Sequence, residues 1–183
     1  GRMSNASDWV FVTSNPNKVR EAERILGFTL QHAAVELDEL QAETVGAVAL
    51  AKAQAAFQKL GRPVIVEDAG LELVGLGGFP GPFIKFWEKL GGLPSICRTA
   101  DGLGDRGVRA VCALGICSQA GSDVVVGSID GTVAAAPRGQ NGFGWDAIFI
   151  PQGEDRTFAE MTAAEKIARS HRRKAWELLR ERL

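Results

Sequence analysis

The sequence predicts an α/β fold, because short runs of β-forming residues alternate with segments whose apolar residues recur at helical spacing. A β-type run at Trp9–Thr13 precedes an amphipathic segment that begins at Pro16. A second strand within Phe28–Leu40 precedes an Ala-rich helical segment that ends near Leu60. A third run, Val64–Val66, consists of β-branched residues only, which is typical of a buried strand.

Length and composition indicate one soluble domain, residues 3–183, with the two residues ahead of Met3 interpreted as a cloning remnant. The net charge of −1 provides no global field that would attract nucleic acid or an anionic membrane. The three cysteines lack a CxxC spacing, which favours reduced, structural thiols over a zinc site. Because no apolar run approaches a membrane span and no signal peptide is recognised, we expect a cytoplasmic protein.

The segment after the first strand predicts a tight polar turn and the start of a helix. Ser14 or Asn15 can cap the helix, Pro16 suits its first turn, and Gly27 ends it. Free N–H groups at a helix N-terminus attract anions, and Lys18 adds a full positive charge. The pattern is not a Walker A loop, so it indicates an anion site only weakly.

The second strand is followed by acidic residues and a long helix. Glu36, Glu39 and Glu43 lie in the connecting segment, and Glu43-Thr44 opens the helix. Lys52 stands off its apolar stripe, and a solvated lysine is the simplest interpretation of it.

The chain is organised around the segment Pro63–Trp87, in which the third strand is predicted to stop at Glu67 and Asp68. Two carboxylates at the carboxyl end of a strand are a candidate Mg²⁺ site, because Mg²⁺ is held by one or two carboxylates, water and phosphate oxygens. The alternative is a solvated junction between strand and turn. A Gly/Pro-rich stretch and a basic-aromatic cluster at Lys85 complete the segment.

The second half predicts an irregular segment at Pro94–Gly107 and antiparallel strands within Val108–Cys117 and Asp123–Ala136. Glycines flank Phe143, which would let a ring approach a flat ligand, although core packing explains Phe143 and Trp145 equally well.

One helix is predicted over Thr162–Leu183, opened by a Thr162/Glu165 capping box. Near its start lies a cluster of Lys166, Ser170, His171 and Arg172, with positions 166 and 170 on one face. Cations at the start of a helix oppose its dipole, so this cluster indicates an anionic or polar partner, or else a solvated basic face. Together with the anion turn, the carboxylates and the aromatic segment, it supports a nucleotide-binding hypothesis.

The ordered segments TSNPNK, PVIVEDAG, GGFPGPFIKFW, GFGWDAIF and AEMTAAEKIARSHR resemble the motifs of the inosine triphosphate pyrophosphatase (ITPase) family over nearly the whole chain. The resemblance implies Mg²⁺-dependent hydrolysis of noncanonical purine nucleoside triphosphates (ITP, dITP, XTP) to the monophosphate and pyrophosphate. It also implies an elongated, twisted mixed β-sheet with flanking helices, two lobes around a central active-site cleft, and a homodimer.

By position, the resemblance implies that Asp68 and Lys18 are catalytic and that Asp68, Glu39 and Glu67 bind the metal, with Glu36 or Glu43 as alternatives to Glu39. It implies the following substrate-binding residues: Thr13, Ser14, Asn15, Lys18, Lys52, Ala69, Lys85, Phe143, Gly144, Trp145, Asp146, Lys166, Ser170, His171 and Arg172.

Two departures from the family pattern affect the phosphate side. Ser14 stands where the family turn usually has Gly, which would introduce strain if that position needs φ > 0. Ala69 replaces a common Ser or Thr and removes a hydroxyl contact. Two other functions stay open: a related pyrophosphatase acting on modified pyrimidine triphosphates, and a non-catalytic nucleotide-binding protein. A nucleic-acid-binding module fits least, because the net charge is nearly neutral.

Overall fold

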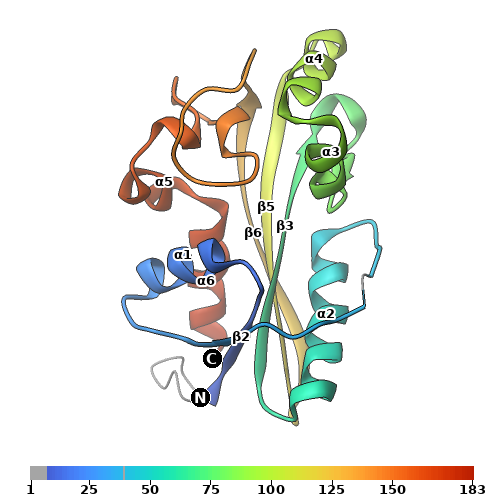
Figure 1. The fold of residues 1–183 in the computed structure, drawn as a ribbon, viewed down its shortest axis with the longest axis vertical. Coiled ribbons are helices and arrows are strands. Elements are labelled where there is room, and N and C mark those ends of the chain that lie inside the picture. Colours follow the sequence, from blue (N-terminus) through green and yellow to red (C-terminus); the bar gives the residue numbers. More distant parts are fainter. Residues whose placement is uncertain (1–7, 39) are drawn as a thin grey trace. The chain divides into compact units, whose positions relative to one another are not determined.

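The computed structural model describes residues 8–38 and 40–183 and alternates strands with helices, as the sequence predicts (Figure 1). The strands are β1 (Val10–Val12), β2 (Gln31–Ala33), β3 (Val64–Leu73), β4 (Pro80–Gly81), β5 (Gly107–Ser118), β6 (Gly121–Val133) and β7 (Phe149–Pro151). The α-helices are α1 (Pro16–Leu26), α2 (Val45–Leu60), α3 (Ile84–Gly91), α4 (Leu93–Leu103), α5 (Ala163–Arg169) and α6 (His171–Arg182). Short 3-10 helices among the described residues include η2 (Val74–Leu76), η3 (Asp146–Ile148) and η4 (Phe158–Glu160).

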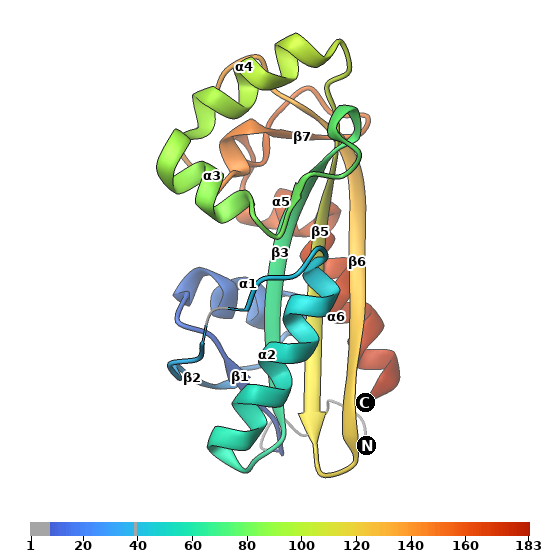
Figure 2. The same ribbon diagram turned by 90° about the vertical axis from the view of Figure 1, so that its right-hand side faces the viewer.

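The seven strands form one mixed sheet in the order β2-β1-β3-β5-β6-β7, with β4 paired to β3. Strand β1 runs parallel to both neighbours, with Val10 opposite Gln31 on one side and Val64 on the other. Strands β4 and β7 pair antiparallel with β3 and β6. Strands β5 and β6 correspond to the two strands predicted in the second half and are joined by a short turn (Figure 2). The expected α/β class with a mixed sheet is therefore confirmed.

The chain divides into two compact units, which we call unit 1 (residues 1–68, 112–127 and 172–183) and unit 2 (69–111 and 128–171). Each has its own apolar core. In unit 1, α1 and α6 pack on one side of the strands and α2 lies on the other (Figure 1), and the core includes Phe11, Ile65 and Trp176. The core of unit 2 is built around Ile96, Phe149 and Phe158.

The ends of α1 and α2 are where the sequence predicts them. The Asn15 side chain accepts a hydrogen bond from the Asn17 N–H at 3.0 Å, so Asn15 rather than Ser14 caps α1. Thr44 caps α2 in the same way, accepting from the Ala47 N–H at 3.1 Å. Gly27 ends α1 with φ of 81°, a left-handed conformation that a glycine adopts without strain.

Strand β3 is longer than predicted, which changes the place of the two acidic residues. It continues through Ala69 and Gly70 to Leu73, where its last residues pair with β4. Glu67 and Asp68 therefore lie within a buried strand and not at its end, and the interpretation as a solvated junction is wrong. The strand continues because Leu71 and Leu73 alternate with Glu72 and supply a β-type pattern beyond the glycine.

Two further sequence-based expectations about helices are wrong. The segment Pro94–Gly107, expected to be irregular, contains most of α4, because Pro94 occupies the first turn and Ile96 and Ala100 share a buried face. The single helix expected over Thr162–Leu183 is two helices, because Ser170 is extended, with φ of −81° and ψ of 152°. The predicted capping box at Thr162 is present.

Within the part of the chain that the structure describes, every helix is too short or too polar to cross a lipid bilayer.

Candidate functional site

The turn between β1 and α1 has the polar frame that the sequence predicts. The Asn15 N–H donates to the Thr13 hydroxyl at 3.1 Å, while the Asn15 side chain caps the helix. Ser14 is exposed, and its φ is not positive, so the strain expected from a serine at this position does not arise. The first backbone N–H groups of α1 and the side chain of Lys18 therefore start from one short segment, an arrangement suited to an anion.

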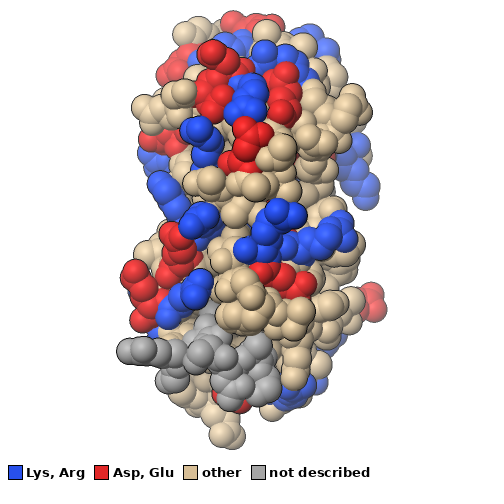
Figure 3. Space-filling view, turned by 90° about the vertical axis from the view of Figure 1, so that its left-hand side faces the viewer, with Lys and Arg blue, Asp and Glu red and all other residues tan. Residues whose placement is uncertain are grey.

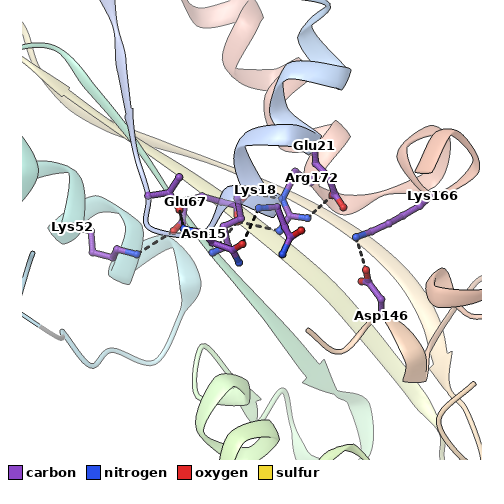
Figure 4. A network of polar contacts seen from close by, with 10 residues as sticks. Asn15, Lys18, Glu21, Lys52, Glu67, Asp146, Lys166 and Arg172 are labelled. Atoms are coloured by element: carbon purple, nitrogen blue, oxygen red, sulfur yellow. Dashed lines mark hydrogen bonds and ion pairs between the residues drawn. The ribbon is translucent and has the colours of Figure 1, made fainter. Parts of the chain in front are cut away.

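Glu67 is the centre of a buried ionic network in unit 1 (Figure 4). Its Oε1 accepts from Arg172 Nε at 2.5 Å, and its Oε2 accepts from Arg172 Nη2 at 3.1 Å. Lys18 Nζ lies 3.1 Å from the same Oε2, and Arg172 Nη1 donates to Glu21 Oε1 at 2.8 Å. Glu67 and Arg172 are each only 2% exposed, so the network joins α1, β3 and α6 inside the unit.

The charges of this network explain the protonation states of its members. Burial alone would raise the pKa of Glu67, but the cations of Arg172 and Lys18 outweigh it and hold that pKa far below its ordinary value. Burial alone would lower the pKa of Arg172, but the Glu67 carboxylate and then Glu21 raise it well above its ordinary value. Burial, reinforced by the charge of Glu67, raises the pKa of the neighbouring Cys112 thiol. Glu67 is therefore an ionised carboxylate and Cys112 a neutral thiol.

Asp68 follows Glu67 along β3, so its side chain projects to the opposite face of the strand. On α2, Lys52 Nζ donates to the backbone carbonyl of Glu67 at 3.2 Å, so Lys52 is not a plain solvated lysine. Asp68 is 7% exposed. The Lys52 ammonium group therefore contacts the backbone of β3 at Glu67, the residue directly before the Asp68 carboxylate.

The residues present fit Mg²⁺ only as a site shared with substrate. No three His, Cys, Asp or Glu side chains gather into a metal cage among residues 8–38 and 40–183. Mg²⁺ does not need such a cage, because one or two carboxylates with water and phosphate oxygens suffice, and Asp68 can supply one. Of the other candidates, Glu36 and Glu43 are exposed, and Glu39 lies outside the described residues. Glu67 has both oxygens in ion pairs, and its metal role stays a prediction.

Unit 2 contains a second buried ion pair, between Lys166 of α5 and Asp146 of η3 (Figure 4). The Lys166 Nζ to Asp146 Oδ2 distance is 2.7 Å, and the same oxygen accepts the Phe143 N–H at 3.0 Å. Lys166 Nζ also lies 4.5 Å from the centre of the Phe143 ring, within cation–π distance. A side chain at Gly142 would overlap the Asp146 carboxylate, so the absence of a side chain here lets that carboxylate lie close to the backbone. The predicted base-binding residues 143, 146 and 166 are therefore brought together.

His171 is packed among aromatic rings in unit 2. Its ring centre lies 5.2 Å from that of Trp145 and 6.1 Å from that of Phe158, which is nearly parallel to it. Trp145 in turn packs edge-on against Phe149 at 5.8 Å. The core-packing interpretation therefore holds for Trp145.

A comparison with known protein families shows which family the chain belongs to. Residues 9–182 match the sequence profile of the Ham1 family. The chain belongs to the Ham1 family. A dITP/XTP pyrophosphatase of Methanopyrus kandleri is 39% identical to this Ham1 chain, over 94% of both chains. An inosine triphosphate pyrophosphatase of Yarrowia lipolytica is 40% identical over 93% of both.

Solved structures agree with the Ham1 assignment. A HAM1 protein from Coxiella burnetii superposes with a TM-score of 0.83 at 26% identity, covering 94% of this chain and 96% of that one. A nucleoside-triphosphatase / dITP/XTP pyrophosphatase from Mycobacterium abscessus has a TM-score of 0.74 at 31% identity, covering 93% and 98%. The resemblance to the ITPase family is thereby confirmed, and so is the expected fold class.

The members of the basic cluster predicted in this Ham1 chain have partners within the protein. Lys166 and Arg172 each have a carboxylate of their own unit, and Ser170 is buried at the break between α5 and α6. On the face shown in Figure 3, basic side chains are interspersed with acidic ones. Ion pairs between residues close to this part of the chain include Arg156–Glu165, Arg169–Glu154 and Arg173–Glu177. The two basic side chains Lys166 and Arg172 are therefore buried and matched by carboxylates, which removes the argument for a solvated basic face.

Two further predicted residues of the Ham1 chain are Lys85 and Ala69. Lys85 is exposed on α3, with its Nζ 5.2 Å from the ring centre of Phe86, and Ala69 lies within β3. Sequence reasoning missed Glu21 and Glu88. Glu21 lies three residues after Lys18 on α1, a spacing that could have indicated a shared role. Nothing local in the sequence pointed to Glu88, whose pKa is raised by burial and by the charge of Asp146.

Proposed function

We propose that the chain hydrolyses noncanonical purine nucleoside triphosphates, namely ITP, dITP and XTP, to the nucleoside monophosphate and pyrophosphate. Membership of the Ham1 family, with relatives named dITP/XTP pyrophosphatase over almost their full length, carries the proposal. The geometry supports it, because unit 1 holds groups suited to a triphosphate and unit 2 holds groups suited to a purine base.

In unit 1 we assign the Thr13–Lys18 turn and Lys52 to the phosphate groups. The N–H groups that open α1 and the two ammonium groups would offset charge that develops on phosphate oxygens, and such electrostatic stabilisation is expected to contribute most to this reaction. Asp68 would orient the attacking water or accept its proton, a role that requires the ionised carboxylate. A Mg²⁺ ion held by Asp68 would supply Lewis-acid stabilisation of the phosphate oxygens.

In unit 2 we assign the Phe143–Asp146 segment and Lys166 to the base, with Ser170 and His171 beside them. Lys166 donates hydrogen bonds and accepts none, so a 6-oxo group suits it and the 6-amino group of adenine does not. A buried donor that faces another donor costs about 1–3 kcal/mol. Discrimination against adenine nucleotides follows from this mismatch, as in sites that reject a ligand lacking the correct polar group.

The test is pyrophosphate release from dITP, XTP, dGTP, dATP and dTTP, with and without Mg²⁺. We expect Mg²⁺-dependent turnover of dITP and XTP, and loss of it in Asp68→Asn. Asp155→Asn changes an exposed aspartate of unit 2 in the same way and serves as the matched control. Hydrolysis of dTTP instead of dITP would contradict the base assignment, and tight dITP binding without turnover would indicate a binding protein.

We also propose that the chain acts as one domain in a cytoplasmic homodimer. The family resemblance supports the dimer, and the match of one family profile to residues 9–182 supports the single domain. Light scattering during gel filtration would measure the mass of the assembly against the 19.5 kDa of one chain.

A further inference from the structure

Three ion pairs link four charged side chains of unit 1, and the backbone of α1 joins the two ends into what we call the ring. Lys18 pairs with Glu67, Glu67 with Arg172, and Arg172 with Glu21, at 3.1, 2.5 and 2.8 Å. The ring closes through the backbone of α1, because Lys18 and Glu21 lie one turn apart on that helix. Two cations and two carboxylates balance, so the ring as a whole is neutral.

The middle of the ring is fixed and its Lys18 end is accessible. The side chains of Glu67 and Arg172 are 0% and 3% exposed and meet through two hydrogen bonds, a geometry that fixes both planes. The Lys18 side chain is 20% exposed. An ammonium group has three N–H donors, and its contact with Glu67 Oε2 uses one of them. The other two can serve a ligand while the contact with Glu67 is kept.

We propose that Glu67 is a positioning residue that holds the Lys18 ammonium in place for a phosphate group, and is not a metal ligand. The inference rests on the proposed function for the identity of the reaction, whereas the ion pairs of the ring are observed independently of that function. Both Glu67 oxygens face cations, and Asp68, the residue suited to a metal, projects from the other face of β3. The backbone carbonyl of Glu67 also accepts a hydrogen bond from Lys52. Glu67 therefore contacts both Lys18 and Lys52, the two lysines assigned to the phosphate groups.

The ring explains how a flexible lysine can be ready before the substrate arrives. A lysine side chain has several freely rotating bonds, and their ordering opposes binding unless a neighbour has already fixed them. Glu67 is in turn held by Arg172, and Arg172 by Glu21 of the helix that carries Lys18. A displacement of α1 would therefore strain the contacts that orient its own lysine.

The first variant is Glu67→Asp, which keeps the charge but is one methylene too short to reach Lys18 and Arg172 together. We expect kcat for dITP to fall about 10- to 100-fold, as a small misplacement of a catalytic group does. The Mg²⁺ concentration for half-maximal activity should stay within about twofold of wild type, whereas substitution even of a residue that only holds a metal ligand in place typically weakens metal affinity about 10- to 100-fold. A Mg²⁺ requirement raised tenfold or more would overturn the proposal.

A readout that needs no turnover is the ¹H–¹⁵N signal of the Lys18 ammonium group, assigned with Lys18→Met. An ion-paired, partly buried ammonium exchanges slowly and gives a signal, and we expect Glu67→Asp to abolish it. An unchanged signal would overturn the positioning role. If wild type hydrolyses neither dITP nor XTP, the proposed function fails, and this signal together with calorimetric binding of inorganic tripolyphosphate still tests the ring.

A second variant keeps the proposal testable if Glu67→Asp does not fold. Glu21→Gln removes the far end of the ring and leaves Glu67, Lys18 and the metal candidate Asp68 intact. We expect kcat to fall less than in Glu67→Asp, the Lys18 signal to broaden, and the Mg²⁺ requirement to stay the same. Glu181→Gln, an exposed site on α6 of the same unit, is the matched control. If Glu21→Gln and Glu181→Gln have the same kcat and the same Lys18 signal, the proposed role of the ring is wrong.

Discussion

At the scale of residues, the buried cations of this chain each lie against a carboxylate, and the energetic consequence is largest for Lys166. Both side chains of the Lys166–Asp146 pair are almost fully buried, at 4% and 6% exposed. Taking such charges out of water is costly, and the cost is balanced only while both partners are present. Removal of one partner should therefore be more harmful than removal of both.

We predict that Lys166→Met lowers the free energy of unfolding by about 3–5 kcal/mol, because it leaves the Asp146 carboxylate buried without its cation. The double variant Lys166→Met/Asp146→Asn should recover part of that loss, since the side-chain carbonyl of the introduced asparagine can still accept the Phe143 N–H. Urea unfolding of the two single variants and the double variant measures the coupling. Strictly additive effects would show that the pair contributes nothing to stability.

Glu88 makes a pH-dependent contribution to stability of the opposite sign to an ordinary ion-paired acid. Burial, and then the charge of Asp146, raise the pKa of Glu88 above its ordinary 4.5. The folded state binds this proton more tightly, so the contribution is present below pH 4.5 and is lost as pH rises through the folded pKa. We predict that Glu88→Gln, which cannot titrate, gains stability relative to wild type as pH rises from about 4 to 7, measured as urea midpoints. Parallel pH profiles would contradict this.

At the scale of elements, the sequence predicts those that carry their own local signals. Helices α1 and α2 have caps, apolar stripes and terminal glycines, and all of these features are in place. Helix α4 was missed because Pro94 and nearby glycines suggested a loop. The helix forms because the apolar residues on its inner face are buried against the core. Strand β3 was predicted too short because acidic residues seldom lie within a buried strand. Tertiary ion pairs, which local patterns do not reveal, make that placement possible.

Close packing of β5 against α2 leads to a prediction about Gly115. A Cβ at this position would lie 2.7 Å from the carbonyl carbon of Ala49 on α2, so the helix would have to move. We predict that Gly115→Ala destabilises the protein by about 1–3 kcal/mol. It should also lower phosphate affinity, because α2 carries Lys52.

The matched control is Gly102→Ala on α4, where an added Cβ meets nothing within 4 Å. This substitution should stabilise the protein by about 0.5–1 kcal/mol, since alanine loses less conformational entropy in a helix. Thermal unfolding and urea titration measure both variants. A neutral Gly115→Ala would mean that α2 adapts without cost.

At the scale of the whole molecule, the candidate site depends on contacts between residues far apart in the chain. Glu67 and Arg172 are 105 positions apart, and neither has a local signal for the other. Motif resemblance placed Lys18, Asp68 and the Phe143–Asp146 segment in the site. It could not show that Arg172 binds Glu67, because spacing within a helix grouped Arg172 with Lys166. The chemistry of the residues was predictable from the sequence, whereas their pairing was not.

The three free cysteines test whether the molecule opens as a whole. Cys97 of unit 2 is 1% exposed, while Cys112 and Cys117 of unit 1 are 0% and 7% exposed. Burial raises the pKa of all three thiols, which slows their labelling further. Strands β3, β5 and β6 each supply residues to both units, so disruption of one unit removes strand residues that the other needs.

We predict that Cys117 reacts first with a thiol reagent at about pH 8, through local opening near the end of β5, and that Cys97 and Cys112 react later at a common rate. Labelling followed by peptide mass spectrometry measures each site. Gly115→Ala, which destabilises unit 1, should then accelerate Cys97 in unit 2 as much as Cys112. Rates for Cys97 and Cys112 that differ more than about tenfold would mean that the two units unfold independently.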